Sequence, residues 1–491
     1  MGLSGSGSVE RWELFEWSIE GPAGGNPFRE IRLHGEFACG SRKVTVPGFY
    51  DGNGVYRIRF MPDREGTWSY ETTSSCEALS GHKGRFECIA PRSPANRGPV
   101  RVRDELHFEY ADGGAYLPFG TTCYAWIHQE EELREATLRT LAASPFNKLR
   151  MCVFPKNYSF NATDPERFPF PGSRADGFDF DRFDPEFFAR LEKSIEELGR
   201  LGIEADLILF HPYDNGRWGF DEMTAEQDAF YLRYVLARLS AYRNVWWSLA
   251  NEYDLMDRKS EGDWDRLFRI VQEEDPYGHP RSIHNWTRMY DPDSIRMYDH
   301  GKSWVTHCSV QHWDVTLVPH WHKQYRKPIV VDECGYEGNI PQRWGNLPAE
   351  EMAHRVWDGT FRGGFVGHGE TYVHPADELW WAKGGRLYGE SPARIAFLRK
   401  LLEEAPACLK PFASIPDVPA IGVEYSYYLL YFGIHRPKYR EFELPEGLTF
   451  RFELIDTQAM TIETIAPSLA GKCRVELPGR PYLALRVRAN E

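Results

Sequence analysis

Between residues 100 and 412, short apolar runs alternate with amphipathic helical stretches, and this alternation constrains the fold more than any other feature of the chain. Strands that alternate with helices are typical of a parallel sheet whose strands are connected by helices. The runs that we interpret as strands span residues 116–124, 148–154, 204–210, 244–250, 281–286, 305–311, 328–333 and 363–372. Eight such units within about 310 residues predict an α/β fold, a (β/α)₈ TIM barrel.

Helical patterns lie between most of these runs. One begins at Asp184, a residue type that caps helices, followed by Pro185 at the first helical position. Thr224 and Gln227 have the spacing of a capping box at the start of the next helix. The helices that we expect span residues 184–202, 224–240, 263–275, 348–359 and 391–404.

All-β patterns flank the barrel region on both sides. The segments before and after it are rich in β-forming residues, which Gly, Pro and Asp separate into short strands. PRSPANRGP, residues 91–99, has the composition of a linker. We therefore predict three domains: an N-terminal immunoglobulin-like β-sandwich at 9–96, a catalytic barrel at 97–412 and a C-terminal β-sandwich at 413–491.

Composition argues against several classes of partner. The net charge is −14 and no Lys/Arg-rich run occurs, so we expect no nucleic-acid partner. No apolar run reaches the length of a membrane span, so no membrane partner is expected. The N-terminal stretch MGLSGSGSVE lacks the apolar core of a signal peptide, which favours a cytoplasmic location.

Metal and redox motifs are weak in this sequence. The chain has nine cysteines but no CxxC pair. HWHK, residues 320–323, offers two histidines that could share a metal ion if the segment were a strand, but no third ligand has suitable spacing. We expect no metal site and no cofactor.

The stretch VWWSLANEYD, residues 245–254, places Asn251 and Glu252 directly after the fourth apolar run. Glu333 closes the seventh run, PIVVDE. In a barrel of this kind the strand ends share one rim, where the functional groups lie. Either glutamate alone is more often part of a loop salt bridge or a helix cap, but two on one rim can serve as an acid and a nucleophile.

ANE at 250–252 and the glutamate that closes PIVVDE resemble glycoside hydrolase clan A, the retaining (β/α)₈ glycosidases that include glycoside hydrolase family five. This resemblance implies that Glu252 is the acid/base, Glu333 is the nucleophile and Asn251 binds the sugar 2-hydroxyl. A closer resemblance, to bacterial glycosidases with a sandwich domain on each side of the barrel, rests on residues 46–70, 209–214 and 367–372.

Further candidates for substrate binding lie along the same rim. Arg150, on the second strand, could hold the nucleophile in its charged form, although a buried structural ion pair is an equal alternative. Alternation along the sixth strand turns only one of two neighbours inward, and we expect His312 to point inward and Gln311 outward. The other candidates are His211, Asp214, His284 and Glu370 as hydrogen-bonding partners, with Trp126 and Trp380 as rings that stack on a sugar.

The long aromatic loop at 155–180 is expected to narrow the cleft. Together these features predict a retaining glycoside hydrolase that is exo-acting on small glycosides or oligosaccharides, with a carbohydrate as its partner. One alternative is an inverting enzyme, in which Glu252 or Asp214 acts with a different base at a wider separation. A second is a carbohydrate-binding protein without catalysis, because a fold alone does not define a function. The sugar and the oligomeric state stay open.

Overall fold

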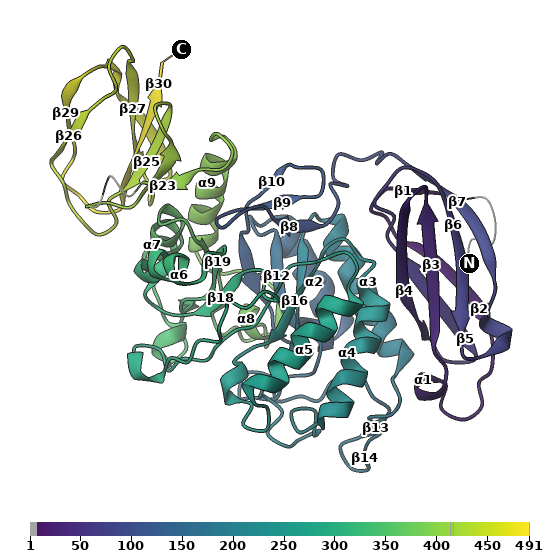
Figure 1. The fold of residues 1–491 in the computed structure, drawn as a ribbon. Coiled ribbons are helices and arrows are strands. Elements are labelled where there is room, and N and C mark those ends of the chain that lie inside the picture. The colour runs from purple at the N-terminus through teal and green to yellow at the C-terminus, as the bar shows by residue number, and fades with distance from the viewer. Residues whose placement is uncertain (1–6, 413–414, 416, 491) are drawn as a thin grey trace.

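The computed structural model describes residues 7–412, 415 and 417–490. A β-rich part lies at each end of the chain, and the helix-rich part lies between them (Figure 1). The predicted domain boundary at residue 413 lies outside the described residues, as does most of the N-terminal stretch on which the cytoplasmic prediction rests.

Eight parallel strands form the centre of the molecule. They belong to two sheets, one of five strands and one of three, and one strand lies within each of the eight predicted runs. In order these strands are β11 (Gly120–Thr122), β12 (Lys148–Cys152), β15 (Glu204–Phe210), β16 (Val245–Ala250), β17 (Arg281–Ser282), then β18 (Cys308–Gln311), β19 (Ile329–Glu333) and β21 (Phe365–Val366).

Hydrogen bonds join the edges of the two sheets. A β-bridge links Thr121 to His368, which follows β21. At the other seam, the backbone N–H of Thr306 donates to the carbonyl of Arg281 at 3.0 Å. The eight strands therefore form a nearly closed, TIM-barrel-like sheet, and their carboxyl ends share one rim.

Helices surround this sheet, and two of those with eight or more residues were not predicted. Asp184 caps α3 by accepting from the N–H groups of Glu186 and Phe187, and Thr224 with Gln227 forms the expected capping box of α4. The helices are α2 (Glu131–Ala142), α3 (Pro185–Arg200), α4 (Ala225–Leu239), α5 (Glu261–Glu274), α6 (Val318–Tyr325), α7 (Ala349–Phe361) and α9 (Ser391–Glu403), with the short α1 (Pro27–Glu30) and α8 (Trp380–Lys383). Among the helices of eight or more residues, α2 and α6 were not predicted, and the short α1 and α8 were not predicted either.

The HWHK segment lies on α6, so its assignment to a strand is wrong. Residues two apart on a helix point in different directions. His320 and His322 therefore do not share the geometry that the strand interpretation offered to a metal ion.

A small antiparallel sheet closes the amino end of the barrel-like sheet. It consists of β8 (Val100–Val102), β9 (Phe108–Tyr110) and β10 (Ala115–Tyr116). Phe108 and Tyr116 pack in one buried cluster with Trp246 of β16 and Val330 of β19. This apolar cluster fills the amino end, which leaves the carboxyl end for the candidate site.

The N-terminal strands form one sheet that curls over its own core, in agreement with a sandwich. Its strands are β1 (Ser8–Glu10), β2 (Phe15–Glu20), β3 (Leu33–Cys39), β4 (Arg42–Tyr50), β5 (Val55–Phe60), β6 (Gly66–Ser74) and β7 (Lys83–Ile89). The strand order is β1-β7-β6-β3-β4-β5-β2, yet the rings of Phe15 in β2 and Phe86 in β7 stack at 4.2 Å. Strands far apart in the order thus face each other across the core.

The C-terminal strands form two layers. The six-stranded sheet contains β23 (Lys410–Pro411), β24 (Ala420–Val423), β25 (Tyr427–Tyr431), β30 (Leu483–Ala489), β27 (Phe450–Asp456) and β28 (Thr461–Leu469). The pair β26 (Tyr439–Glu443) and β29 (Lys472–Glu476) covers it, with Phe442 and Phe452 in contact between the layers. Tyr431 docks this unit on α7 through a hydrogen bond to His354 of 3.0 Å.

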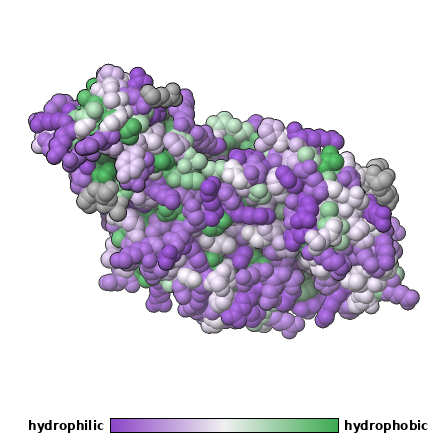
Figure 2. All heavy atoms as spheres, turned by 45° about the horizontal axis from the view of Figure 1, so that its top comes forward, coloured by the Kyte–Doolittle hydropathy of each residue, from purple (hydrophilic) through white to green (hydrophobic). Residues whose placement is uncertain are grey.

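The face shown in Figure 2 is largely hydrophilic, with hydrophobic residues in small separate groups. Most of the large aromatic side chains are buried inside the molecule instead. None of the helices in the described part of the chain has the length and apolar character needed to cross a membrane.

Candidate active site

Glu252 lies one residue beyond β16 in a strained backbone conformation. Asn251 still continues the strand, since its N–H donates to the carbonyl of Phe210 at 3.0 Å. Glu252 then has φ 51° and ψ 51°, in the left-handed region that non-glycine residues seldom adopt. Such strain is typical of functional sites, where the surrounding structure holds it in place. It ends the direction of the strand, and a short 3₁₀ helix, Tyr253–Leu255, begins directly after Glu252.

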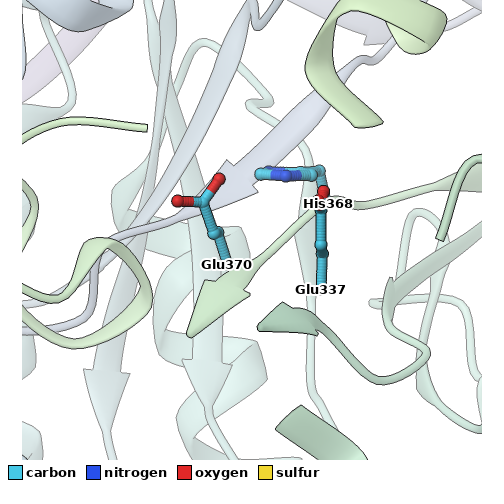
Figure 3. Close-up of side chains that lie close together, drawn as sticks. All are labelled: Glu337, His368 and Glu370. Atoms are coloured by element: carbon cyan, nitrogen blue, oxygen red, sulfur yellow. The ribbon is translucent and has the colours of Figure 1, made fainter. Parts of the chain in front are cut away.

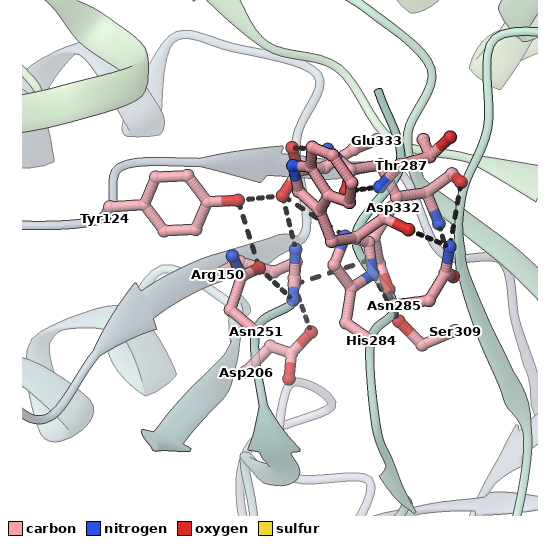
Figure 4. A network of polar contacts seen from close by, with 12 residues as sticks. Tyr124, Arg150, Asp206, Asn251, His284, Asn285, Thr287, Ser309, Asp332 and Glu333 are labelled. Carbon is pink, nitrogen blue, oxygen red and sulfur yellow. Dashed lines mark hydrogen bonds and ion pairs between the residues drawn. The ribbon is translucent and has the colours of Figure 1, made fainter. Parts of the chain in front are cut away.

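Glu333, at the end of β19, is surrounded by hydrogen-bond donors. Its Oε1 accepts from the hydroxyl of Tyr124 and lies 3.4 Å from Nη1 of Arg150 and 3.3 Å from Nε2 of His284. Arg150 also donates to Oδ1 of Asn251 at 3.2 Å. Figure 4 shows these side chains converging on Glu333 from several strands. The predicted Arg150, Asn251 and His284 therefore all lie within one network with the predicted nucleophile.

Gln311 lies between the two glutamates, so the expectation that it points outward is wrong. Its amide donates to Oε2 of Glu333 at 3.3 Å, and its side chain acts to lower the pKa of Glu252. The pairing of β18 with β19 shifts register between Val310 and Gln311, which breaks the alternation on which the expectation rested. His312 instead stacks on Trp313 at 4.2 Å, and its Nδ1 accepts the N–H of Asp314, so the predicted role of His312 is not supported.

The two carboxyl groups differ in their surroundings. Burial raises the pKa of both Glu252 and Glu333 to about 7. For Glu252, the positive charge of Lys156 acts in the opposite direction and lowers the pKa. Oε2 of Glu252 has no hydrogen-bond partner among the described residues, whereas both oxygens of Glu333 face donors. Because donors favour a carboxylate, these contacts favour the charged form of Glu333 and the protonated form of Glu252.

Lys156, in the loop after β12, is a site residue that the sequence analysis missed. It is 2% exposed, and its ammonium group lies 3.8 Å from the ring centre of Tyr124 and 3.9 Å from that of Tyr213. The rings of Tyr158 and Trp381 complete an aromatic cage. Burial lowers the pKa of Lys156 to about 8. The only sequence signal was a lysine within an aromatic loop next to a predicted rim.

A chain of polar contacts supports the site from within the barrel. Nδ1 of His284 lies 3.1 Å from Oγ of Ser309, which donates to Asp332 at 2.5 Å. Asp332 pairs with Lys148 at 2.9 Å, and Lys148 pairs with Asp206. These contacts hold the His284 ring in one orientation beside Glu333.

Three other residues that were predicted to bind substrate form hydrogen bonds with backbone groups. His211 lies 3.2 Å from the Phe154 carbonyl through Nε2, and its Nδ1 accepts the N–H of Tyr213. Asp214 accepts the N–H groups of Trp218 and Phe220, each at 2.6 Å. Glu370 accepts two N–H groups from the loop before α9. These bonds shape loops and use part of the hydrogen-bonding capacity of His211, Asp214 and Glu370, and substrate binding by these residues stays a prediction.

The two predicted stacking rings lie in the core. Trp126 is completely buried, packs with α2 and α3, and donates to the carbonyl of Arg134. Trp380 is 1% exposed and donates to Thr121 at 2.8 Å. Both rings are packed among other side chains, and this burial does not favour the predicted stacking on a sugar. The neighbouring Trp381 contacts Tyr124 and Lys156 and lies at the site.

Three segments of the chain match known protein families. Residues 103–403 match the apiosidase-like catalytic domain family, while residues 8–75 and 416–488 match two domains of unknown function, DUF5060 and DUF5605. No curated protein matches the chain. The chain belongs to the apiosidase-like family.

Solved structures extend this comparison. A crystal structure from Bacteroides vulgatus, classed as a glycoside hydrolase, is 42% identical over 98% of this chain and 100% of that chain, with a TM-score of 0.91. A family 5 glycoside hydrolase from the same organism is 16% identical over 80% of this chain and 94% of that chain, with a TM-score of 0.62, and shares the fold. The protein is a glycoside hydrolase, and the predicted resemblance is confirmed.

Proposed function

We propose that this protein is a retaining glycoside hydrolase in which the eight strands close as a (β/α)₈ barrel around the catalytic rim. The observation that carries the proposal is the asymmetry of the two carboxyl groups. Donors surround Glu333, whereas one oxygen of Glu252 has no partner in the described residues. A retaining mechanism needs one ionised and one protonated carboxyl group on the same site.

In the first step, Glu333 attacks the anomeric carbon while Glu252 donates its proton to the leaving oxygen. The bond from the anomeric carbon to that oxygen breaks, and a glycosyl-enzyme ester forms at Glu333. Arg150 and Tyr124 hold Glu333 as a carboxylate before the attack. Asn251, which Arg150 and Tyr124 both contact, is placed to bind a sugar hydroxyl beside the reaction centre.

In the second step, Glu252 takes a proton from water, and the water oxygen attacks the anomeric carbon. The ester bond to Glu333 breaks, which restores its carboxylate. Gln311 contacts both glutamates and is placed to hold them at a fixed separation through both steps.

We propose that the enzyme is exo-acting, because loops from three strands meet over the site. Phe160, in the loop after β12, contacts Trp344 at 6.3 Å and Trp381 at 5.6 Å between ring centres. Trp344 follows β19 and Trp381 follows β21, so aromatic walls extend over the rim from several sides. A walled pocket fits the end of a small glycoside better than the middle of a long chain. An apioside is the first candidate substrate, because the family is described as apiosidase-like.

The test is hydrolysis of a panel of aryl glycosides, pyranosides and furanosides including an apioside, by wild type and Glu333→Ala. We expect the substitution to lower kcat by roughly 10⁴-fold or more, because the nucleophile is lost. Azide should restore turnover and give a glycosyl azide of inverted configuration. Wild-type enzyme with azide is the control. Full activity of Glu333→Ala would contradict the assignment.

A second variant tests the acid/base. Glu252→Gln cannot donate a proton, so it should lose activity on leaving groups of high pKa. It should keep the first step on dinitrophenyl glycosides, whose leaving groups need no proton. An equal loss on both kinds of substrate would contradict the proposed role. Direct release of a product with inverted configuration by the wild type would support the inverting alternative.

A further inference from the structure

Glu337, His368 and Glu370 converge at a second place, outside the catalytic network. Glu337 in β20 (Glu337–Gly338) is the direct partner of Glu370 in β22 (Glu370–Thr371), on neighbouring parallel strands. His368 precedes Glu370 by two residues, so the two side chains leave the chain on the same side. Figure 3 shows the three side chains turned toward one another. One nitrogen or oxygen atom from each lies within 4.8 Å of the others.

One ring nitrogen of His368 has a hydrogen-bond partner, and the other has none among the described residues. Nδ1 lies 3.1 Å from the hydroxyl oxygen of Thr121. Nε2 is buried and has no hydrogen-bond partner in the part of the chain that the structure describes. The whole residue is 1% exposed. A buried polar atom without a partner is energetically unfavourable, so an unfilled contact here needs a physical explanation.

The two carboxyl groups are also buried, and among the described residues neither forms an ion pair with Lys or Arg. Backbone N–H groups at the start of α9 hold them. Glu370 accepts from the N–H groups of Tyr388 and Gly389, and Glu337 accepts from the N–H groups of Glu390 and Ser391 and from the hydroxyl of Tyr372. Each of these bonds uses one acceptor position of a carboxylate oxygen, which leaves free positions that an ion can use.

We propose that Glu337, His368 and Glu370 form a binding site for a divalent transition-metal ion such as Zn²⁺ or Mn²⁺. One imidazole nitrogen with two carboxylates suits these ions, whereas Ca²⁺ and Mg²⁺ prefer oxygen ligands alone. Metal–ligand bonds of about 2.1 Å place two ligand atoms at most about 4 Å from each other. A pair of ligand atoms at the 4.8 Å limit would therefore move closer by roughly half an ångström when the metal binds. Thr121 and the backbone N–H groups supply the outer contacts that orient such ligands.

A metal ion bound by these three side chains links the ends of β20 and β22 to the start of α9. The site takes no part in the proposed glycosidase steps, and it does not rest on them. Its role is to stabilise the strand ends that follow Glu333 and the bridge from His368 to Thr121. The sequence analysis expected no metal here because the three ligands are 31 and 2 residues apart, a spacing that matches no metal motif.

The experiment measures bound metal in the tag-free wild-type protein after dialysis against Zn²⁺ or Mn²⁺ and gel filtration. We expect about one equivalent of one of these metals and a melting temperature that falls when a chelator removes it. Less than a tenth of an equivalent of either metal would overturn the inference.

Variants locate the ion. His368→Gln and Glu337→Gln should each abolish stoichiometric binding. Thr121→Val keeps all three ligands and should weaken the affinity by about 10- to 100-fold, which keeps the test valid if the other variants fail to fold. His300→Gln is the matched control, because His300 is equally buried, with both ring nitrogens unpartnered among the described residues, and should keep full binding. Wild-type affinity in both His368→Gln and Thr121→Val would place any ion elsewhere.

Discussion

The hydroxyl of Tyr124 has one hydrogen and two acceptors within reach. One is Glu333, and the other is Oδ1 of Asn251 at 3.2 Å. When Glu333 is charged, the hydrogen is drawn to it, because bonds to a charged acceptor are stronger. Tyr124 is therefore a positioning residue that stabilises the carboxylate form of the nucleophile.

Tyr124→Phe is expected to lower kcat by about 10²-fold, as for other single donors aimed at a charged group in an active site. Loss of the donor raises the pKa of Glu333, so the acidic limb of the kcat/KM profile should move to higher pH. The measurement is the pH profile on the best aryl glycoside. Tyr231→Phe, which removes a buried hydroxyl bonded to the Leu209 carbonyl, should leave the profile unchanged. An unmoved acidic limb in Tyr124→Phe would refute this role.

Lys156 acts on the other glutamate. Its positive charge lowers the pKa of Glu252, which burial alone raises. In the proposed mechanism activity needs protonated Glu252, so activity should decline as the pH rises through the pKa of that group. Lys156→Met removes the charge, and the basic limb of kcat/KM should therefore move to higher pH. Lys193→Met, on the exposed side of α3, is the control. A basic limb that stays in place or moves to lower pH would contradict the assignment.

For the candidate site, the sequence predicted the rim positions of residues that follow directly from strand ends, and few others. Glu252, Glu333 and Asn251 could be predicted because a rim position follows from where an apolar run stops. Tyr124 and Lys156 lie in loops, where no periodicity fixes the direction of a side chain. His211 and Asp214 follow a strand end as well, but backbone N–H and carbonyl groups nearby bind them first.

Among the helices and strands, those with strong local sequence signals were predicted, whereas features that depend on distant pairing were not. Residues 184–200 have a capping Asp184 and strong amphipathic spacing, and α3 begins at the predicted position. The helix α6 has only eight residues and an HWHK segment, so its pattern can be taken for a strand. The register shift at Gln311 depends on the pairing of β18 with β19, and no single strand contains that information.

The loop after β12 contains the aromatic wall on which the proposed exo-specificity rests. Phe160 bridges Trp344 and Trp381, so Phe160→Ala should open the wall of the pocket. We expect the ratio of kcat/KM for internally linked sugars to that for terminal sugars to rise several-fold, because the pocket no longer ends at the wall. The measurement compares oligosaccharides with aryl glycosides. Phe180→Ala, in the same loop but packed on Phe170 and Phe220, is the matched control. An unchanged ratio in Phe160→Ala would mean that the wall does not limit the substrate.

In the whole molecule, buried ion pairs join the N-terminal sheet to the barrel helices. Arg59 of β5 pairs with Glu192 of α3 at 2.7 Å, and Glu192 also pairs with Arg238 of α4 at 2.6 Å. Arg238 reaches back to Asp51 at 2.6 Å. The sequence predicted the three-part organisation from changes in pattern along the chain, but it carried no signal for these contacts. The pairs Arg59–Glu192 and Asp51–Arg238 join residues 133 and 187 positions apart, so only the folded molecule brings them together.

Glu192→Gln tests how much the ion pairs between the N-terminal sheet and the barrel helices contribute to the stability of the protein. Burial alone would raise the pKa of Glu192, but the charges of Arg59 and Arg238 hold that pKa below its ordinary value. A carboxyl group whose pKa is lowered by folding stabilises the protein above its unfolded pKa, and this contribution is lost as the pH falls through its folded pKa. At about pH 7 we expect a loss of about 3 kcal/mol, because two buried arginines lose their shared partner.

Scanning calorimetry of wild type and Glu192→Gln at about pH 7 and at about pH 3 measures this difference. The gap between the two melting temperatures should shrink at the lower pH, since wild-type Glu192 is then increasingly protonated and resembles glutamine. Glu403→Gln breaks an exposed pair with Arg399 within α9 and should change the melting temperature little at either pH. A gap that stays constant with pH would mean that Glu192 acts through packing and not through its charge. In that case the Arg59–Glu192–Arg238 network would not be what fixes the N-terminal sheet against α3 and α4.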